Sequence, residues 1–309
     1  MSNSSSDSIK SKAEYARLQR NGVVIFVCTV LAWCSFSNIA FSANDKLLPE
    51  GKFNNHQCVQ CHKKTNANLV ADWRMSVHGK GDAVANCVAC HGNSHNGAAV
   101  KARQDETCIA CHGGERKPVV HSYANSKHGL ILKLEEKKWN WTQPLAQANY
   151  RTPGCAYCHM HAAGHNVSTM VRNADLLQKD SKEMESIKDA TRQICQDCHA
   201  PRYFSRLFDN GEKMLEIARM KVREARDLLL QARKQYSTEE LKPAEKRYQE
   251  MRSVHLKNVY LGIAHQSPDY QWWYGQPALD GDLLRIKGSI SELRRIKNAT
   301  LGQQTQCAQ

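Results

Sequence analysis

The sequence predicts a mainly α-helical protein in two parts, and three observations support this fold class. Residues 43–200 contain few long periodic segments and are rich in Gly, Asn, Lys and His, which is typical of short helices and loops. A Cys-x-x-Cys-His pattern recurs five times in this part. After Pro201, apolar residues recur at helical spacing. We therefore expect short helices and loops followed by a C-terminal bundle of long helices.

The first 42 residues have the order of a secretory signal. A polar stretch with four Lys and Arg residues precedes the apolar segment 23–41, and the small residues Ala40 and Ser42 fit cleavage before Ala43. The same apolar segment has about the length needed to span a bilayer as an uncleaved anchor. In either case we expect the remaining chain to be periplasmic, soluble or attached to the inner membrane.

The five Cys-x-x-Cys-His motifs predict covalent haem attachment. Two thiols at this spacing add to the two vinyl groups of one haem, and the following imidazole becomes the proximal iron ligand. The sequence therefore predicts five c-type haems as cofactors. The attachment cysteines and proximal histidines are Cys58, Cys61 and His62; Cys87, Cys90 and His91; Cys108, Cys111 and His112; Cys155, Cys158 and His159; and Cys195, Cys198 and His199.

Zinc binding and disulfide bonding are two other uses of these cysteines, and both account less well for the full motif. Zinc sites use paired Cys-x-x-Cys but do not require a His after every second Cys. A disulfide framework suits an exported chain but also leaves the five histidines unexplained. Ten of the thirteen cysteines are used by the motifs. Of the others, Cys28 and Cys34 belong to the apolar segment, and Cys307 is either a free thiol or an intermolecular link.

The positive charge has a partner within the predicted holoprotein. The chain carries a formal charge of +13, and residues 1–42 contribute four positive and two negative charges, which leaves about +11. Five haems bring roughly ten propionate charges. The basic residues are therefore expected to pair with propionates, and no nucleic-acid partner is predicted.

The sixth iron ligand decides what each haem does. A second His makes an electron-transfer haem, whereas an open site permits catalysis. Four histidines stand next to Gly or small residues, which lets a haem approach, and we predict them as distal ligands: His78, His128, His165 and His265. Weaker distal candidates are His95, His121 and His255, whereas His56 and His161 are expected to face solvent and Met160 to pack.

The region after Pro201 predicts long helices. An apolar stripe recurs every three or four residues from Leu215 to Tyr236, with Ala at alternate positions. Residues 237–240 form a capping box that opens a second helix, and a third is expected over 283–297. The stripe forms either an internal bundle or an oligomer seam. The predicted divisions are a signal or anchor (1–42), a pentahaem domain (43–205) and a helical region (206–309).

Several segments resemble one family. The stretches "NSKHG", "PGCAYCHM", "GHNVS", "CQDCHAPRYF" and "AHQSPDYQWWYG", between residues 56 and 276, are similar to the hydroxylamine oxidoreductase (HAO) family of multihaem cytochromes c. More distantly they resemble pentahaem nitrite reductases. The resemblance implies a mostly helical fold, often trimeric, with closely spaced haems. It also implies redox chemistry on a small nitrogen compound at one open haem, and a tyrosine cross-link from a neighbouring chain.

The sequence departs from this family in two ways. Full members carry eight haems, whereas five motifs are present here, and Cys-x-x-Cys-Lys, usual in the nitrite reductases, does not occur. The resemblance implies that the His62 haem is the catalytic one if the five motifs match the family's last five.

Three hypotheses follow. The first is electron transfer to redox partner proteins, including another multihaem subunit. The second is oxidation or reduction of hydroxylamine or nitrite, with His165 or Tyr270 handling protons. The third is a membrane-anchored, quinol-linked cytochrome.

Overall fold

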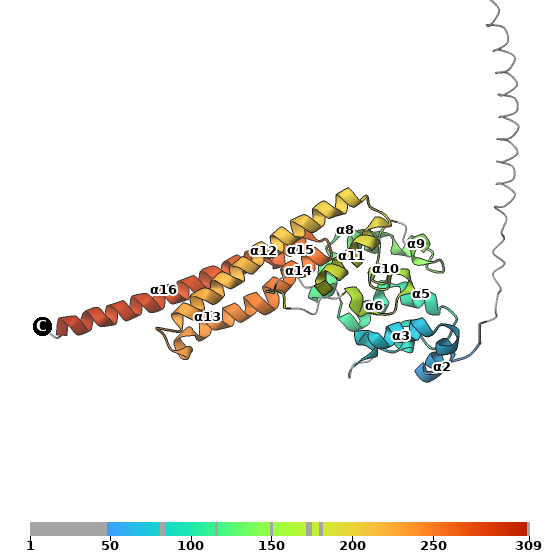
Figure 1. Cartoon of the computed structure of the whole chain (residues 1–309), viewed down its shortest axis with the longest axis horizontal. Coiled ribbons are helices and arrows are strands. Elements are labelled where there is room, and N and C mark those ends of the chain that lie inside the picture. Colours follow the sequence, from blue (N-terminus) through green and yellow to red (C-terminus); the bar gives the residue numbers. More distant parts are fainter. Residues whose placement is uncertain are drawn as a thin grey trace, which may run out of the picture. The chain divides into compact units, whose positions relative to one another are not determined.

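The structure is a computed structural model that describes residues 48–80, 85–114, 117–148, 151–170, 175–178 and 182–307. Within these ranges all regular structure is helical (Figure 1), so the predicted fold class is confirmed. No helix in the described ranges is long and apolar enough to cross a membrane. The predicted signal or anchor segment, 1–42, lies outside the described residues.

Short helices carry the five motifs. The elements of this region are α2 (Asn55–Thr65), α3 (Ala67–Met75), η1 (Val77–Gly79), α4 (Cys87–His91), α5 (Ala98–Arg103), α6 (Asp105–His112), α7 (Pro118–Ala124), α8 (Lys127–Glu135), η2 (Glu136–Lys138), α9 (Leu145–Ala148), α10 (Cys155–His159), η3 (His161–Ala163), η4 (Val167–Met170) and α11 (Lys182–Gln196). The first four motifs lie on α2, α4, α6 and α10, and the fifth begins at the end of α11.

Local chain chemistry places several proximal histidines at the last residue of a helix. Helix α4 ends at His91 and α6 at His112, and each is followed by a glycine. Gly92 has φ 78° and Gly113 has φ 92°, values that glycine adopts without steric cost and that stop a helix. Each imidazole therefore sits at a helix end.

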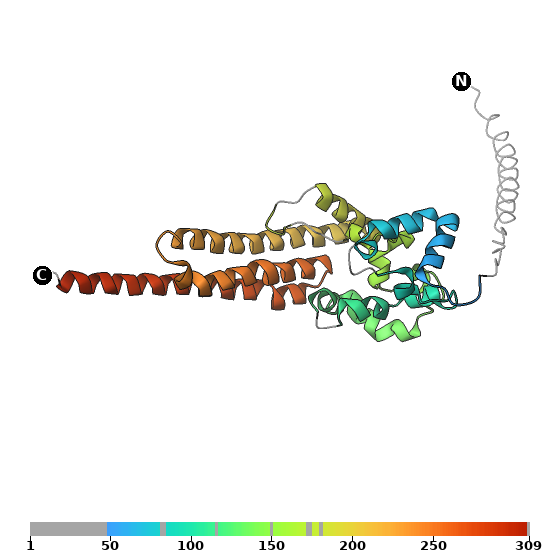
Figure 2. The same ribbon diagram turned by 90° about the horizontal axis from the view of Figure 1, so that it is seen from below.

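The C-terminal region is a bundle of long helices, seen in Figures 1 and 2. It contains α12 (Pro201–Ala232), α13 (Thr238–Glu250), a π-helical turn η5 (Met251–His255), α14 (Leu256–Ala264), α15 (Pro268–Tyr274) and α16 (Gln276–Cys307). The predicted capping box is present: the Ser237 hydroxyl accepts the Glu240 amide, and the Glu240 carboxylate accepts the Ser237 amide. Helix α16 is longer than predicted, because its buried stripe already begins at Leu279.

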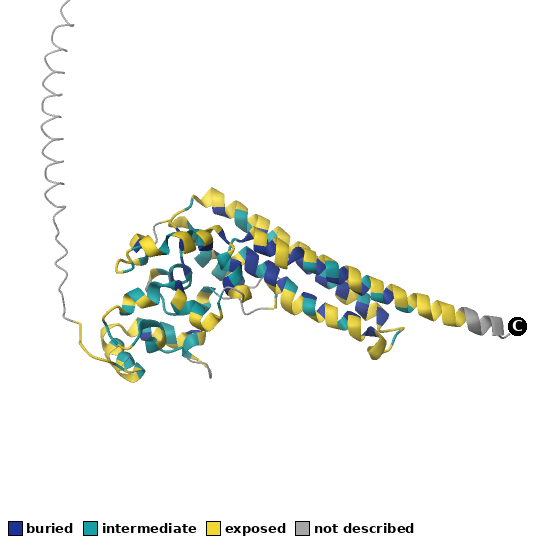
Figure 3. Ribbon diagram, turned by 180° about the vertical axis from the view of Figure 1, so that it is seen from behind, coloured by how far each residue is buried: buried dark blue, intermediate teal, exposed yellow. Residues whose placement is uncertain are grey.

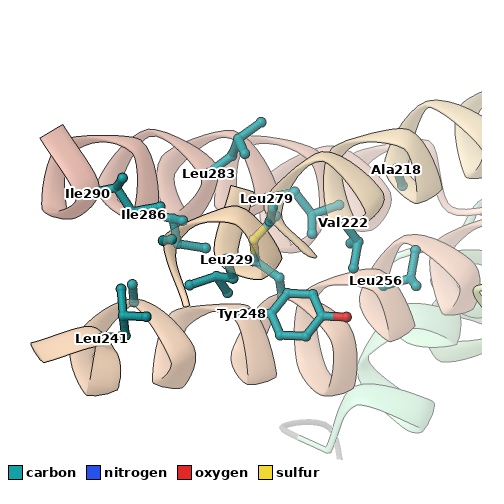
Figure 4. Close-up of a cluster of buried hydrophobic side chains, with 14 of the residues drawn as sticks. Ala218, Val222, Leu229, Leu241, Tyr248, Leu256, Leu279, Leu283, Ile286 and Ile290 are labelled. Carbon is teal, nitrogen blue, oxygen red and sulfur yellow. The ribbon is translucent and has the colours of Figure 1, made fainter. Parts of the chain in front are cut away.

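The core of the bundle is the predicted apolar stripe (Figure 4). Ala218, Val222 and Ala225 on α12 have 0% of their surface exposed. They belong to one cluster with residues of α13, α14 and α16, such as Leu241 and Leu279. Burial of a Val or Leu side chain contributes roughly 1.5–3 kcal/mol. The stripe therefore forms an internal bundle, which was the first of its two interpretations.

Buried side chains are unevenly distributed along the chain. Figure 3 shows the buried residues concentrated in the bundle, whereas the motif-bearing region is mostly half-buried or exposed. Residues 50–309 nevertheless form one compact unit, in which α7 contacts α14 and α15. The predicted boundary at 205/206 lies inside α12, and the division into two domains stays a prediction.

Candidate haem-binding centres

In four of the five motifs, the ring of the proximal histidine faces the ring of a second histidine. The distances between ring centroids are 6.4 Å for His62–His95, 6.0 Å for His112–His78, 6.1 Å for His91–His165 and 6.1 Å for His199–His128. The remaining proximal residue, His159, lies within electrostatic reach of His265. The four predicted distal candidates therefore each lie near a proximal histidine, and His95 joins them.

The spacing of these rings fits an iron atom between them. A metal–imidazole bond of about 2.0 Å plus about 1.1 Å from nitrogen to ring centre gives a centroid separation of roughly 6.2 Å for two axial ligands. Two imidazoles joined by a direct hydrogen bond would lie about 5 Å apart. The observed 6.0–6.4 Å matches the metal-bridged arrangement. The residues present therefore fit a haem between each pair.

Burial keeps the paired imidazoles in the form that binds metal. It lowers the pKa of His78, His91, His128 and His159, and the facing or neighbouring histidine lowers each further. For His265 burial, assisted by His159, lowers the pKa to about 4. A neutral imidazole has a free nitrogen lone pair, which is what iron requires.

Hydrogen bonds around His265 select one tautomer of its ring. The Ser122 hydroxyl donates to the carbonyl oxygen of Val119 at 3.0 Å, so its oxygen is left to accept. The His265 Nδ1 atom lies 2.7 Å from this oxygen and therefore carries the proton that it donates. This leaves the Nε2 lone pair of His265 for a metal, and Ser122, with 0% exposure, fixes the ring.

Two of the facing histidines lie on copies of the same local structure. The pattern aromatic-x-x-Ser-x-His-Gly occurs twice, with the serine as N-cap of a helical turn. The Ser76 hydroxyl accepts the Gly79 amide at 3.2 Å, and the Ser126 hydroxyl accepts the Gly129 amide at 3.1 Å. The copies are Trp73–Gly79 and Tyr123–Gly129. They present His78 and His128, respectively.

The glycine of each copy is required by close backbone contact. A Cβ atom at Gly79 would collide with the Trp73 carbonyl oxygen, and one at Gly129 with the Tyr123 carbonyl oxygen. The same Cβ atoms would lie 2.8 Å from the next Cα atom along each chain segment. Sequence reasoning noted glycine beside these histidines; comparing the chain with itself would have revealed the repeat.

His95, a weaker distal candidate from the sequence, lies opposite the proximal histidine of the first motif. It lies on a turn between Gly92 and Gly97, both with positive φ. Its ring packs edge-on against Phe53 at 5.1 Å and faces His62. The nearby glycines do not adjoin His95 directly, which is why the adjacency argument missed it. Helix α2, which carries this first motif, has no buried residue.

The attachment cysteines follow one another in space in the order of the chain. Cys87 lies in electrostatic reach of Cys58, and Cys90 of Cys108. The thiol of Cys108 contacts that of Cys155. Cys158 of the fourth motif in turn neighbours both cysteines of the fifth, Cys195 and Cys198. Each motif therefore adjoins the next one.

A surface hydrogen-bond network joins the fourth and fifth motifs. Asp197 Oδ2 accepts the Tyr157 hydroxyl at 2.9 Å and lies 2.8 Å from His161 Nε2. The hydrogen bond from His161 lowers the pKa of Asp197. His161 was expected only to face solvent; its half-exposed side chain instead holds this carboxylate.

Tyr270, a predicted catalytic residue, is buried on helix α15. Its hydroxyl donates to Asn258 Oδ1 at 3.1 Å, and its ring contacts Tyr274 and His121. Burial raises the pKa of Tyr270, so its proton is held more tightly than usual. His255 lies in the bundle, 2.9 Å from the buried carboxylate of Asp282. The proton-handling roles of Tyr270 and His165 stay predictions.

Comparisons with known proteins find similarity to multihaem cytochromes. Residues 82–235 match the family described as "Seven times multi-haem cytochrome CxxCH". A curated relative, a probable nitrite reductase–hydroxylamine oxidoreductase fusion protein of Kuenenia stuttgartiensis, is 22% identical over 75% of this chain, and the match spans 40% of that relative.

Two solved structures share the fold. One is a chain of a reducing HAO-like protein complex of Kuenenia stuttgartiensis, with a TM-score of 0.54, 18% identity, and coverage of 80% of this chain and 87% of that one. The other is a hypothetical multihaem protein, with a TM-score of 0.54, 19% identity, and coverage of 72% and 61%.

Proposed function

Because the chain is a multihaem c-type cytochrome related to the HAO-like proteins, we propose that it transfers electrons through five covalently attached haems. The observation that carries the proposal is the second histidine near every proximal one. When bound, haem supplies reversible one-electron chemistry at iron. Two axial imidazoles leave no coordination position for a substrate, which favours relay of electrons over catalysis.

Each residue class has a defined task in this proposal. The ten motif cysteines would tether the haems, and the five motif histidines would each supply one ligand to iron. His95, His165, His78, His265 and His128 bind from the other side, in the order of the motifs, and exclude water and small ligands. The chain-order contacts between successive motifs support a linear relay, because short separations favour rapid electron exchange.

The proposal is tested by mass spectrometry and EPR on the purified ferric protein. We expect the mass of the mature chain plus five haems, and only low-spin ferric signals. A high-spin signal that responds to added hydroxylamine or nitrite would contradict electron transfer as the sole function. A mass short of five haems would contradict the proposed cofactor count.

A second candidate function places catalysis at the first motif. Helix α2 has no buried residue, so a small ligand could approach the His62–His95 pair from solvent. The curated relative is named as a nitrite reductase–hydroxylamine oxidoreductase fusion. In this alternative, hydroxylamine or nitrite displaces His95, and His165, which faces His91 of the next motif, manages protons. The test is a Soret shift on substrate addition that saturates at one haem in five.

We also propose a periplasmic location and a multihaem partner. The matching chain from a reducing HAO-like complex supports assembly with a second multihaem subunit. Three apolar side chains on α12, Met214, Ile217 and Met220, are exposed and available for such a contact or for a homotrimer. Light scattering, alone and with a candidate partner, distinguishes these assemblies. A mature N-terminus at Ala43 would support export with cleavage, and retention of residues 1–42 would support the anchored, quinol-linked alternative.

A further inference from the structure

Two side chains outside the haem motifs connect one motif to the next in the same way. Asn55 and Asp105 each stand three residues before the first cysteine of a motif, Cys58 and Cys108. Asn55 Oδ1 accepts the backbone amide of Cys87 at 3.0 Å. Asp105 Oδ1 accepts the backbone amide of Cys155 at 2.7 Å. In both cases the amide belongs to the first cysteine of the following motif.

These amides need an acceptor that their own helices cannot provide. The first N–H groups of a helix have no intrahelical partner. Helices α4 and α10 are single turns that begin at Cys87 and Cys155, and of the two only α4 has a side-chain cap of its own, from Asn86. The N-cap of α10 is Gly154, which has no side chain to accept a hydrogen bond. Asp105 therefore supplies the cap from another helix.

The space around Gly154 is fitted to this carboxylate. A Cβ atom at Gly154 would lie 2.6 Å from Asp105 Oδ1 and 3.0 Å from a methyl group of Leu132. Asp105 is 3% exposed, although burial of a carboxylate is costly unless it is hydrogen-bonded. The adjacent Glu106 lies in the same helical turn but is exposed. A favourable interaction with the α6 dipole alone would not require burial, so the Cys155 amide is the better explanation for Asp105.

We propose that Asn55 and Asp105 are positioning residues that fix the attachment helix of the following haem. Numbered by motif, haems 1 and 2 would form one rigid pair and haems 3 and 4 another. This inference rests on the proposed function only in assuming haem at each motif. In a rigid pair the distance and the angle between two haems would stay constant. The rate of electron exchange between them would therefore stay constant as well.

The experiment compares variants of the haem-loaded full chain. Asp105→Ala removes the acceptor, Asp105→Asn keeps an acceptor without the charge, and Gly154→Ala displaces the carboxylate at a backbone conformation that alanine adopts freely. Glu106→Ala is the matched control, because it removes an acidic residue from the same turn. The measurements are amide hydrogen exchange at Cys155, EPR of the low-spin haems and haem count by mass.

We expect the Cys155 amide to exchange about ten- to a hundredfold faster in Asp105→Ala, as loss of a hydrogen bond to a charged group predicts. The low-spin g values of a subset of haems should shift in the same variant and in Gly154→Ala. Asp105→Asn should restore both readouts toward wild type, and Glu106→Ala should change neither. If Asp105→Ala fails to mature but Asp105→Asn carries the wild-type haem complement, the positioning role is also supported.

Unchanged exchange and EPR in Asp105→Ala would overturn the inference, as would an Asp105→Asn variant that behaves like the alanine. An equal effect of Glu106→Ala would assign the result to the helix dipole instead. Wild-type haem count and spin state test the proposed function separately, because the positioning test uses only the ratio of each variant to wild type. Asn55→Ala and Asn55→Asp repeat the comparison at Cys87.

Discussion

At His265 one hydroxyl group decides which ring nitrogen is free. Ser122 donates to Val119 and accepts from His265 Nδ1, so Nε2 is unprotonated. Loss of a hydrogen-bond partner that orients a metal-binding histidine typically changes metal affinity or activity about ten- to a hundredfold. Ser122→Ala is therefore expected to raise the affinity of haem 4 for cyanide about tenfold, because His265 is held less firmly. The measurement is a cyanide titration followed in the Soret band.

The control for this prediction is Ser253→Ala. Ser253 is exposed in the bundle, where its hydroxyl donates to the Gln249 carbonyl oxygen, so its loss should leave cyanide binding unchanged. If Ser122→Ala binds cyanide like wild type, the hydroxyl does not hold the ring. Rescue by Ser122→Thr, which keeps the hydroxyl, would support the hydrogen bond as the cause.

His265 also predicts a pH dependence of stability. Burial lowers its pKa to about 4, from an unfolded value near 6.5, and iron bound at Nε2 would keep the ring unprotonated to a still lower pH. Below pH 6.5 the unfolded chain therefore takes up a proton that the folded chain does not, and stability falls as the pH falls toward 4. Above pH 6.5 the imidazole of His265 is neutral in both the folded and the unfolded chain, so it causes no loss of stability there. Denaturant midpoints at pH 4.5, 5.5 and 7 should decrease with acidity; a midpoint that is constant or rises toward pH 4.5 would contradict the expectation.

At the scale of the elements, the two kinds of helix differ in what forms them. Helix α12 follows from the three- and four-residue spacing of its apolar stripe, which buries one face in the bundle. The motif-bearing helices are short and owe their ends to caps and glycines. Local patterns could therefore predict the long helices well. The short ones depended on contacts between distant segments, such as the hydrogen bond from the Cys155 amide to Asp105, that only the structure brings together.

The repeated aromatic-x-x-Ser-x-His-Gly turn predicts a steric effect at Gly129. Gly129→Ala forces a Cβ atom against the Tyr123 carbonyl oxygen, and relief of such overpacking costs about 1–3 kcal/mol. The turn that carries His128 should shift away from His199. We expect a lower denaturation midpoint and partial loss of the low-spin signal of haem 5, measured by chemical unfolding and EPR.

Gly288→Ala is the matched control for this substitution. Gly288 lies within α16, and a Cβ atom there meets nothing within 4 Å. Alanine at an open helical position stabilises by up to about 1 kcal/mol relative to glycine. The two Gly→Ala changes should therefore have opposite signs in unfolding experiments. A Gly129→Ala protein as stable as wild type, with all haems low-spin, would show that the turn tolerates the methyl group.

At the scale of the whole molecule, covalent chemistry was easier to predict than coordination. A motif such as Cys58–His62 is local, so five attachment points can be read from adjacent residues. The facing histidines lie far away along the chain: His128 meets His199, and His265 approaches His159. One sequence without an alignment does not specify such pairs. The residue patterns predicted the fold class and the resemblance agreed with it, but neither predicted the chain-order contacts between motifs or the links from Asn55 and Asp105.

Net charge offers the most direct whole-molecule test of haem loading. The bare chain has a formal charge of +13 and a sequence pI near 9.2. Five haems would add roughly ten propionate charges, and each ferric iron centre would return about one positive charge, so the net addition is roughly −5 in the ferric state and −10 in the ferrous state. We expect the haem-loaded protein to focus at a lower pH than the bare chain, and lower still when reduced. Variants that lose one haem, because the two cysteines of one motif are changed to Ala, should focus at a higher pH than wild type. The shift should be similar whichever motif is removed. Focusing near pH 9 for a protein with five haems by mass would contradict the charge balance inferred from the sequence.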